Sequence, residues 1–287
     1  MHSEHSAKLM DGRPLAKRIR EATAEKVQRI REATGVTPTL ATILVGENTA
    51  SAVYVRMKRA RCEEVGMKSL AVELPHDSTT EQLLAEVRKL ASDDSVHGIV
   101  IQHPVPKPID RRAAFEAIPL AKDVDGVTSA AIGRMILGMP ALPACTPAGI
   151  MRLLIEYDVT LDGARAVVIG RSPILGRPMA SMLINAHATV TLCHSRTRDL
   201  PVLVSSAEVL IAAVGKPNFV QGDWIKSQAV VVDAGYNEGN VGDVDFSAVA
   251  ERASLITPVP GGVGPMTIAT LLEQTVDAAA AQLRVNL

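Results

Sequence analysis

Short runs of aliphatic residues alternate with helical stretches along most of this 287-residue chain. Residues 39–45 read TLATILV and residues 97–102 read HGIVIQ, and such mostly apolar runs are typical of strands buried on both faces. The segments between them carry apolar residues at helical spacing. Strands that alternate with helices form βαβ units, so the sequence predicts an α/β fold with parallel sheets.

Two proline-rich segments, residues 103–110 and 138–147, interrupt this order. We expect the domain boundary at the second, because a clearer βαβ pattern begins after it. Before it, the sequence predicts helices at residues 14–34, 49–65 and 79–90 and strands at 39–45, 69–74 and 97–102. After it, the sequence predicts helices at 174–185 and 266–283 and strands at 164–169, 188–193, 209–214 and 229–232.

The composition excludes several classes of protein. Lys and Arg number 30 against 31 Asp and Glu, so the basic surplus that neutralises nucleic-acid phosphates is missing. Aromatic residues make up 2%, too few for base-stacking platforms or for the aromatic strands of a β-barrel. No apolar run reaches the roughly 18 residues of a membrane helix, so we expect neither a nucleic-acid nor a membrane partner.

The three cysteines, Cys62, Cys145 and Cys193, lie far apart and form no CxxC pair. This usage favours a reduced, cytoplasmic location and argues against a disulfide framework or a cysteine metal site. Residues 1–6 are polar and do not resemble a secretory signal, and we expect His2 and His5 in a frayed tail rather than on a metal.

The turn after the strand at 164–169 is a candidate phosphate site. It reads GRSPILG over residues 170–176 and opens a helix, whose N-terminus offers unpaired N–H groups to an anion. Ser172 replaces the second glycine of the usual GxGxxG pattern and Gly176 comes one position late, so an ordinary strand-to-helix turn is the alternative.

The next strand ends in LCHSRT, residues 192–197, without an acidic residue. NAD sites usually carry Asp or Glu there to bind the ribose hydroxyls. Arg196 or Arg171, with the hydroxyls of Ser195 and Thr197, would instead bind a 2′-phosphate. The pattern predicts NADP rather than NAD, with a solvated strand end as the alternative.

Tyr54 and Lys58 are spaced i, i+4 on one predicted helix face, a candidate pair for proton transfer. A partly buried ring beside a lysine with a solvated head is the alternative. The short-chain dehydrogenases also use a Tyr-x-x-x-Lys pair, but there it follows the nucleotide-binding glycines. Here the pair precedes Gly170, so the order argues against that family.

Three further segments are candidates for ligand contact. Gln102 ends a buried strand, where open α/β sheets place ligand contacts. Residues 122–126, KDVDG, lack the later ligands of a calcium loop, so we expect a tight turn that presents an aspartate. Residues 258–267, PVPGGVGPMT, form a loop of fixed shape and bare backbone before a helix.

Together these segments resemble the bifunctional methylenetetrahydrofolate dehydrogenase/cyclohydrolase family. The resemblance covers nearly the whole chain and rests on the order and spacing of its motifs. These also include LMDG at 9–12, YVRMK at 54–58, CTPAG at 145–149, GRP at 176–178 and GDWI at 222–225.

The resemblance implies two α/β domains with a cleft between them, the second a Rossmann-type parallel-sheet domain that binds NADP. The folate-binding catalytic domain would comprise residues 1–146, completed by the C-terminal helix 267–287, and the NADP-binding domain residues 147–266. The resemblance also implies a homodimer formed through the nucleotide-binding domains, with tetrahydrofolate derivatives as substrates.

The same resemblance assigns roles to residues. Lys58, with its pKa lowered by burial, would transfer the proton in the hydrolysis, tuned by Tyr54 and Gln102, while Asp125 would bind the pterin and Asp123 orient its loop. These catalytic residues would also bind the folate, together with Pro260, Gly261, Gly262, Val263 and Gly264. The dinucleotide would contact Gly170, Arg171, Ser172, Ser195, Arg196 and the backbone near Tyr236.

The implied reaction is oxidation of 5,10-methylenetetrahydrofolate to the methenyl compound with NADP⁺, then hydrolysis to 10-formyltetrahydrofolate. Two departures leave alternatives open. His103 stands where members of the family usually have leucine. It is either a spacer or a group that alters the hydrolysis. Tyr236 stands where they usually have isoleucine. A dehydrogenase with weak or lost cyclohydrolase activity is therefore an alternative, and a non-catalytic dinucleotide sensor is a second.

Overall fold

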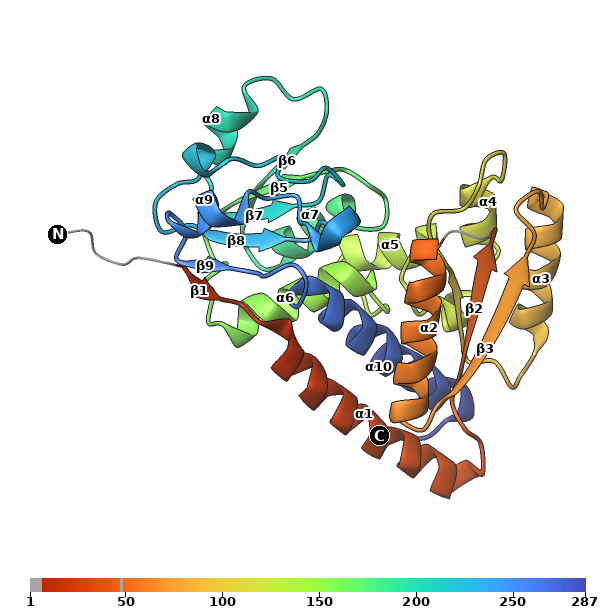
Figure 1. The fold of residues 1–287 in the computed structure, drawn as a ribbon. Coiled ribbons are helices and arrows are strands. Elements are labelled where there is room, and N and C mark those ends of the chain that lie inside the picture. Colours follow the sequence, from red (N-terminus) through yellow and green to blue (C-terminus); the bar gives the residue numbers. More distant parts are fainter. Residues whose placement is uncertain (1–6, 47–48) are drawn as a thin grey trace. The chain divides into compact units, whose positions relative to one another are not determined.

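The computed structural model describes residues 7–46 and 49–287, without the side chains of residues 49–54. It confirms the predicted α/β class, with two parallel sheets (Figure 1). The chain divides into two compact units. Unit 1 comprises the described residues up to Ala16, together with Met135–Met139 and Thr146–Thr267, and unit 2 comprises Lys17–Arg134, Pro140–Cys145 and Ile268–Leu287.

Unit 1 contains a six-stranded sheet in the order β1-β9-β8-β7-β5-β6, in which every neighbouring pair is parallel. All the carboxyl ends therefore meet at one edge of the sheet. Aliphatic side chains from β5, β7 and β8 form its core. The strands are β1 (Lys8–Leu9), β5 (Arg165–Ile169), β6 (Thr189–Cys193), β7 (Val209–Ala212), β8 (Val230–Asp233) and β9 (Leu255–Ile256).

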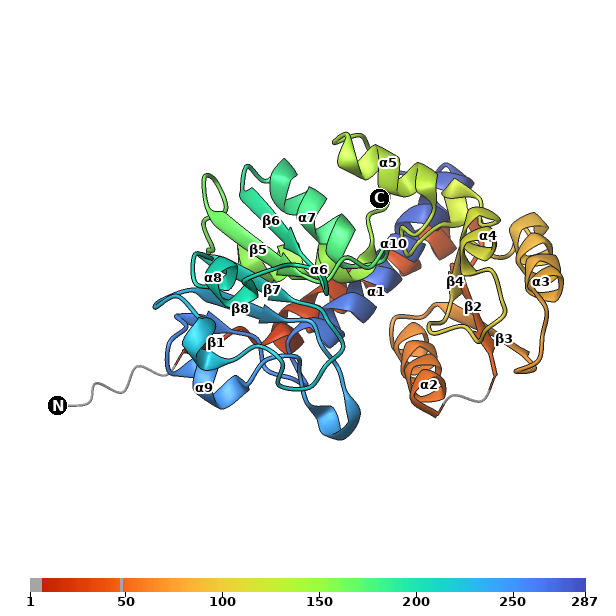
Figure 2. The same cartoon turned by 90° about the horizontal axis from the view of Figure 1, so that it is seen from above.

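Unit 2 contains a three-stranded parallel sheet in the order β3-β2-β4. The strands are β2 (Thr39–Val45), β3 (Lys68–Leu74) and β4 (Gly98–Ile101). The middle strand, β2, is buried along its whole length, as expected for a strand covered on both faces. Helices α2 (Thr49–Glu64) and α3 (Thr80–Ser92) lie on opposite faces of this sheet (Figure 2).

The remaining helices include two long ones, at the two ends of the described chain. Helix α1 ends at Thr34, where Gly35 takes the left-handed conformation (φ 73°) that commonly terminates helices. The two long helices are α1 (Gly12–Thr34) and α10 (Val263–Leu283). The others are α4 (Arg111–Glu116), η1 (Leu120–Lys122), α5 (Ser129–Ile136), α6 (Cys145–Glu156), α7 (Gly176–Asn185), α8 (Leu200–Val204), η2 (Gly222–Trp224), η3 (Glu238–Asn240) and α9 (Phe246–Ala250).

Helix α10 completes the core of unit 2. Its side chains Leu271, Leu272 and Val276 are buried in one cluster with Leu40 of β2 and Val100 of β4. The hydrophobic effect therefore holds a C-terminal helix against a sheet built from the first half of the chain. None of the described helices is long and apolar enough to cross a membrane.

The predicted long elements match the structure closely, but one boundary matters for the site. Helix α10 begins at Val263, whereas the sequence predicted its start at residue 266. Val263 and Gly264 are thus part of the first helical turn rather than of a loop, and Pro265 lies in the same turn, where its missing N–H removes no helical hydrogen bond.

Candidate active site

A chain of hydrogen bonds joins Lys58 to the end of strand β4. The Lys58 ammonium group, on helix α2, donates to Gln102 Oε1 at 3.0 Å. Gln102 follows β4, and its Nε2 donates to the carbonyl oxygen of His103 at 2.9 Å. Since that carbonyl can only accept, it fixes which end of the amide faces Lys58. The geometry presents an amide oxygen to the ammonium group.

Asp125 lies close enough to Lys58 for their charges to interact, and its carboxylate also accepts hydrogen bonds from the backbone N–H and the thiol of Cys145. Cys145 is the first residue of α6, so the carboxylate lies at a helix N-terminus, where negative charge is stabilised. Burial lowers the pKa of Lys58 and raises the pKa of Asp125, while their mutual attraction opposes both changes. The proton affinities of the two groups therefore lie closer together than they would in water.

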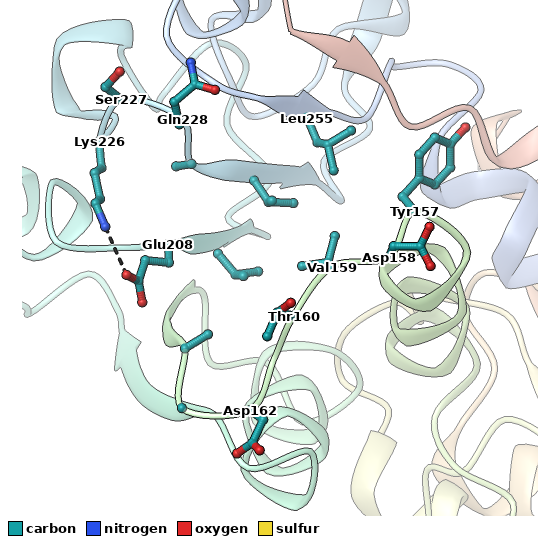
Figure 3. Close-up of a pocket in the computed structure, with 15 residues that line it drawn as sticks. Tyr157, Asp158, Val159, Thr160, Asp162, Glu208, Lys226, Ser227, Gln228 and Leu255 are labelled. Carbon is teal, nitrogen blue, oxygen red and sulfur yellow. Dashed lines mark hydrogen bonds and ion pairs between the residues drawn. The ribbon is translucent and has the colours of Figure 1, made fainter.

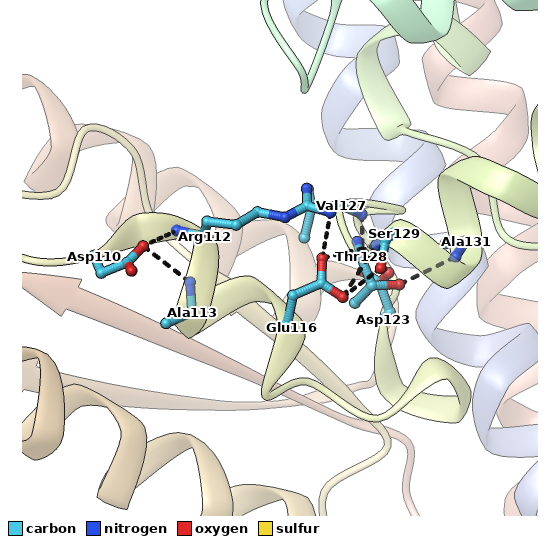
Figure 4. Close-up of polar contacts among 9 residues, drawn as sticks. All are labelled: Asp110, Arg112, Ala113, Glu116, Asp123, Val127, Thr128, Ser129 and Ala131. Carbon is cyan, nitrogen blue, oxygen red and sulfur yellow. Dashed lines mark hydrogen bonds and ion pairs between the residues drawn. The ribbon is translucent and has the colours of Figure 1, made fainter.

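The turn that carries Asp125 is held by its neighbour Asp123, which is fully buried. The Asp123 carboxylate accepts from the backbone N–H groups of Val127 (3.0 Å) and Thr128 (2.9 Å) (Figure 4). Gly126 takes a φ of 62°, and a Cβ there would lie 2.4 Å from the carbonyl carbon of Pro143. The turn leaves no room for a side chain at that position.

A second support comes from helix α10, and the sequence reasoning missed it. Gln274 is buried, and its Nε2 lies 2.8 Å from Val124 O, 3.0 Å from Pro143 O and 3.1 Å from Cys145 Sγ. Val124 directly precedes Asp125, and Cys145 is the hydrogen-bond partner of the Asp125 carboxylate, so Gln274 supports both sides of this contact. A glutamine among the apolar residues of a predicted helix was the available signal, but the sequence does not reveal what such an amide contacts.

His103 lies beside this cluster without contributing charge to it. Its ring packs edge-on against Phe115, with ring centroids 4.9 Å apart. Burial lowers the pKa of His103 to about 4, and the nearby Arg111 and Lys58 charges act in the same direction. The imidazole is therefore neutral at physiological pH. This favours the interpretation of His103 as a spacer that packs where leucine usually stands.

Tyr54 belongs to helix α2, but its side chain lies outside the described residues, as do His2 and His5. Among the residues that the structure describes, no group of three or more His, Cys, Asp or Glu side chains could hold a metal ion. The cluster in unit 2 thus consists of Lys58, Gln102, Asp125 and Cys145, held by Asp123 and Gln274.

The glycine turn in unit 1 has the geometry of a dinucleotide-binding turn. Gly170 follows β5 with a φ of 119°, and a Cβ there would lie 2.1 Å from Ala213 O. A Cβ at Gly176 would lie 1.9 Å from Gly170 O. Both positions therefore require glycine, because backbone occupies the space of a side chain.

Ser172 explains the departure from the usual glycine pattern. Its Oγ accepts from the backbone N–H groups of Leu175 (3.1 Å) and Gly176 (3.4 Å), which begin helix α7. The hydroxyl thus holds the turn and keeps its own proton available for an anion. Arg171 is exposed beside it. The residues present fit a pyrophosphate group.

The segment after β6 is also folded for ligand contact. The Thr197 hydroxyl accepts from the backbone N–H of His194 at 2.8 Å, and His194 Nδ1 accepts from the backbone N–H of Arg196 at 3.1 Å. These bonds close a turn on which the side chains of Ser195 and Arg196 are exposed. Thr197 therefore shapes the turn, while the other two are accessible.

The remaining predicted contacts also lie in unit 1. Tyr236 is 53% exposed, and its hydroxyl donates to Asn240 Oδ1 at 2.6 Å. Gly261 has a φ of 118°, and its carbonyl accepts from the backbone N–H of Gly12. A Cβ at Gly12 would lie 2.1 Å from Gly262 O, so the segment before α10 packs directly on the start of α1.

A cavity of about 550 Å³ opens at the opposite end of the unit 1 sheet (Figure 3). It is lined by residues at the amino ends of β5, β7 and β8, including Ala164, Glu208 and Val230. Lys226 pairs with Glu208 at 3.1 Å on its wall. Ligands of open parallel sheets bind at the carboxyl ends of the strands, so this cavity is separate from the glycine turn.

Comparisons with known proteins cover both halves of the chain. The family model "Tetrahydrofolate dehydrogenase/cyclohydrolase, catalytic domain" matches residues 10–125. The model "Tetrahydrofolate dehydrogenase/cyclohydrolase, NAD(P)-binding domain" matches residues 144–283. The chain is 55% identical to the Bifunctional protein FolD of Saccharophagus degradans, over 97% of this chain and 99% of that protein. It is 58% identical to the Bifunctional protein FolD 1 of Streptomyces avermitilis over the full length of both.

Solved structures agree. The bifunctional FolD methylenetetrahydrofolate dehydrogenase/cyclohydrolase of Campylobacter jejuni superposes with a TM-score of 0.92 at 46% identity, covering 96% of this chain and 99% of that one. The FolD of Trypanosoma brucei, complexed with NADP cofactor and inhibitor, gives a TM-score of 0.94 at 37% identity, covering 98% and 99%.

The contacts of Gln274 predict the effect of its removal. Gln274→Ala leaves the buried carbonyl of Val124 and the partly buried carbonyl of Pro143 without this donor, so we expect the free energy of unfolding to fall by about 2 kcal/mol. Gln282→Ala, on the same helix, removes partly exposed bonds to His97 O and Ala121 O and should lower it by less than about 1 kcal/mol. Urea denaturation of both variants measures the difference, and equal losses would contradict the special role of Gln274.

Proposed function

The chain belongs to the tetrahydrofolate dehydrogenase/cyclohydrolase family, and from that premise we propose how its residues divide two reactions. The protein is a bifunctional enzyme of one-carbon metabolism. It oxidises 5,10-methylenetetrahydrofolate to 5,10-methenyltetrahydrofolate with a nicotinamide dinucleotide, and it hydrolyses the methenyl compound to 10-formyltetrahydrofolate. The Lys58–Gln102–Asp125 cluster is the observation that carries the assignment of the second reaction.

The folate half of the proposal places the substrate against unit 2 residues. The Asp125 carboxylate would accept hydrogen bonds from the amino group and ring N–H of the pterin. Lys58, its pKa lowered by burial, would provide a neutral amine that takes a proton from the attacking water. Gln102 would hold that amine in place through its oxygen, since its Nε2 is already committed to His103 O. Tyr54 and the segment from Pro260 to Gly264 would complete the contacts.

We propose that the dinucleotide cofactor binds to unit 1. Gly170, Arg171 and Ser172 would hold the pyrophosphate at the N-terminus of α7, and the backbone near Tyr236 would line the nicotinamide. The bound nicotinamide supplies the hydride acceptor for the methylene carbon. This step depends on positioning more than on acid or base, which is consistent with a turn built from backbone and hydroxyl groups.

The structure gives no support to the reading of His103 as a group that weakens the hydrolysis. A ring packed on Phe115 whose pKa is about 4 is uncharged beside Lys58 and is too weak a base to compete with it. The relatives that match over the whole chain are named as bifunctional, which favours two activities over a dehydrogenase alone or a non-catalytic sensor.

Substitution of Lys58 tests the hydrolytic role. We expect Lys58→Ala to lower the rate of methenyltetrahydrofolate hydrolysis by at least about 100-fold, because general base catalysis is lost. Lys58→Arg should fail equally, since guanidinium keeps the charge but does not lose its proton. In the wild type, the rate above the uncatalysed background should rise with pH through the lowered pKa of Lys58, as the neutral amine forms.

The control for this measurement is Lys89→Ala, which removes an exposed lysine of α3 whose ammonium group lies 3.6 Å from a carboxylate oxygen of Glu86. It should hydrolyse at the wild-type rate. Undiminished hydrolysis by Lys58→Ala would refute the assignment.

We propose further that the cofactor is NADP. The exposed Ser195 and Arg196 stand where an NAD site carries an acidic residue, and a related enzyme was solved with NADP.

Substitution of Arg196 tests this choice of cofactor. Arg196→Ala should raise the KM for NADP⁺ about 10-fold, because a charged hydrogen bond to the 2′-phosphate is lost, and leave the KM for NAD⁺ unchanged. Arg165→Ala, at the amino end of β5, is the control. Steady-state dehydrogenase assays with NADP⁺ and with NAD⁺ measure the two KM values. An equal rise in both would argue against a contact between Arg196 and the 2′-phosphate.

A homodimer formed through unit 1 is the final element of the proposal. In the described chain β6 pairs with β5 alone and forms the edge of the sheet. Nearby, Asn185 of α7 donates to Met135 O at 2.8 Å, which brings the exposed Ile184 (57%) and Leu137 (74%) into one region. A second copy of the chain would cover these apolar side chains.

Light scattering tests the dimer. The wild-type molar mass should be twice 30.4 kDa, and Leu137→Asp should shift it toward the mass of one chain. A wild-type mass of one chain would rule the dimer out.

We also propose a cytoplasmic location, which the three free and buried cysteines support.

A further inference from the structure

Two buried carboxylates at the carboxyl edge of the unit 1 sheet have no part in the chemistry above. Asp233, the last residue of β8, is 3% exposed, and Asp243 is completely buried. Buried carboxylates need donors, so the contacts of this pair reveal what it holds.

Asp243 gathers donors from two different loops. Its Oδ2 accepts from the backbone N–H groups of Val214 (2.5 Å) and Gly215 (2.9 Å), which follow β7. Its Oδ1 accepts from the backbone N–H of Lys216 (2.9 Å) and from Asn237 Nδ2 (3.1 Å), which follows β8. One carboxylate thus supplies the acceptors for three successive amides and ties them to the neighbouring loop.

Asp233 in turn fixes Asp243. Its Oδ1 accepts from the backbone N–H of Asp243 at 2.9 Å, and its Oδ2 accepts from that of Val244 at 3.0 Å. A Cβ at Gly242 would lie 1.9 Å from Asp233 Oδ2, and one at Gly235 would lie 2.3 Å from Asp243 Oδ1. The pair is packed so closely that the flanking residues must be glycine.

The loop held by Asp243 touches the glycine turn. A Cβ at Gly170 would lie 2.1 Å from Ala213 O, and Ala213 directly precedes the first of the three amides. Strands β5, β7 and β8 are neighbours in the sheet, so their carboxyl ends converge at this place. The amides therefore belong to the same edge as the turn proposed for the pyrophosphate.

We propose that Asp243 is a positioning residue for the nicotinamide end of the dinucleotide. It touches neither cofactor nor substrate and acts by giving the backbone of Val214–Lys216 one conformation before the nucleotide binds. The inference rests on the proposed function, which places the dinucleotide at this edge. Such preorganisation lowers the ordering cost of binding and sets the orientation required for hydride transfer.

A purely structural role predicts a different outcome. If Asp243 served only to stabilise the fold, its loss would impair both activities together. A positioning role predicts damage confined to nucleotide binding and oxidation, because the proposed hydrolytic residues belong to unit 2. The two activities of one protein thus serve as test and internal control.

The test uses Asp243→Asn in the full chain, which keeps the side chain's shape but turns an NH₂ group toward backbone N–H donors. Asp245→Asn is the matched control, because the Asp245 carboxylate instead caps helix α9 through Ala248 N. We expect the Kd for NADP⁺, measured by titration calorimetry, to rise at least 10-fold in Asp243→Asn, with a similar fall in dehydrogenase kcat. Hydrolysis of methenyltetrahydrofolate, assayed without nucleotide, should stay within twofold in both variants.

Hydrogen exchange without nucleotide gives an independent readout. The amides of Val214–Lys216 should exchange faster in Asp243→Asn and at the wild-type rate in Asp245→Asn. Unchanged NADP⁺ affinity in Asp243→Asn, or a parallel loss of hydrolysis, would overturn the positioning role alone. Failure of the wild-type protein to bind NADP⁺ would instead overturn the proposed function, and this inference with it.

Discussion

Buried backbone N–H groups in the turns after the parallel strands must find acceptors, and short side chains supply them in this protein. Asp123 serves the turn that carries Asp125, Ser172 serves the start of α7, and Asp243 serves the loop after β7. Each side-chain acceptor pairs backbone N–H groups that would otherwise need a helix or a strand to provide their partners, so the turn can be compact. The turns at the sheet edge can therefore have irregular shapes that suit a ligand and still be well ordered.

The buried charges of unit 2 follow from a different balance. Removing Lys58 and Asp125 from water disfavours both ions, while their mutual attraction favours both and the Cys145 N–H favours the carboxylate. Neither effect removes the other, so the pKa values of the two groups are displaced toward each other. Lys58 therefore loses its proton more readily than a lysine in water does, and Gln102 presents only an oxygen to it.

The sequence predicted what periodicity and turn chemistry encode. The long helices and the strands of four or more residues lie where expected, because burial imposes a repeat on them. The two-residue strands β1 and β9 and the short helices were not predicted, since too few residues repeat in them to show a period. The 12-residue helix α6 was also missed, and its first residues fall in the proline-rich segment that was taken as the domain boundary. Helical spacing and a strand end marked Lys58 and Gln102 as candidates, and the 122–126 turn marked an aspartate; the resemblance then supplied the roles of Lys58, Gln102 and Asp125. The supporting residues Gln274 and Asp243 escaped prediction, because their roles depend on partners far away in the chain that only the fold brings near.

Helix α10 gives the molecule an order of assembly as well as a core. Leu271, Leu272 and Val276 fill the space against Leu40 and Val100, so unit 2 lacks part of its interior until these residues exist. During synthesis the first half of the chain leaves the ribosome long before them. The strands of unit 2 can pair by then, but the apolar face that α10 covers stays exposed. In unit 1 the strands and the buried residues of the core cluster all precede that helix. The hydrolytic residues, although encoded early, are thus the ones whose surroundings are completed last.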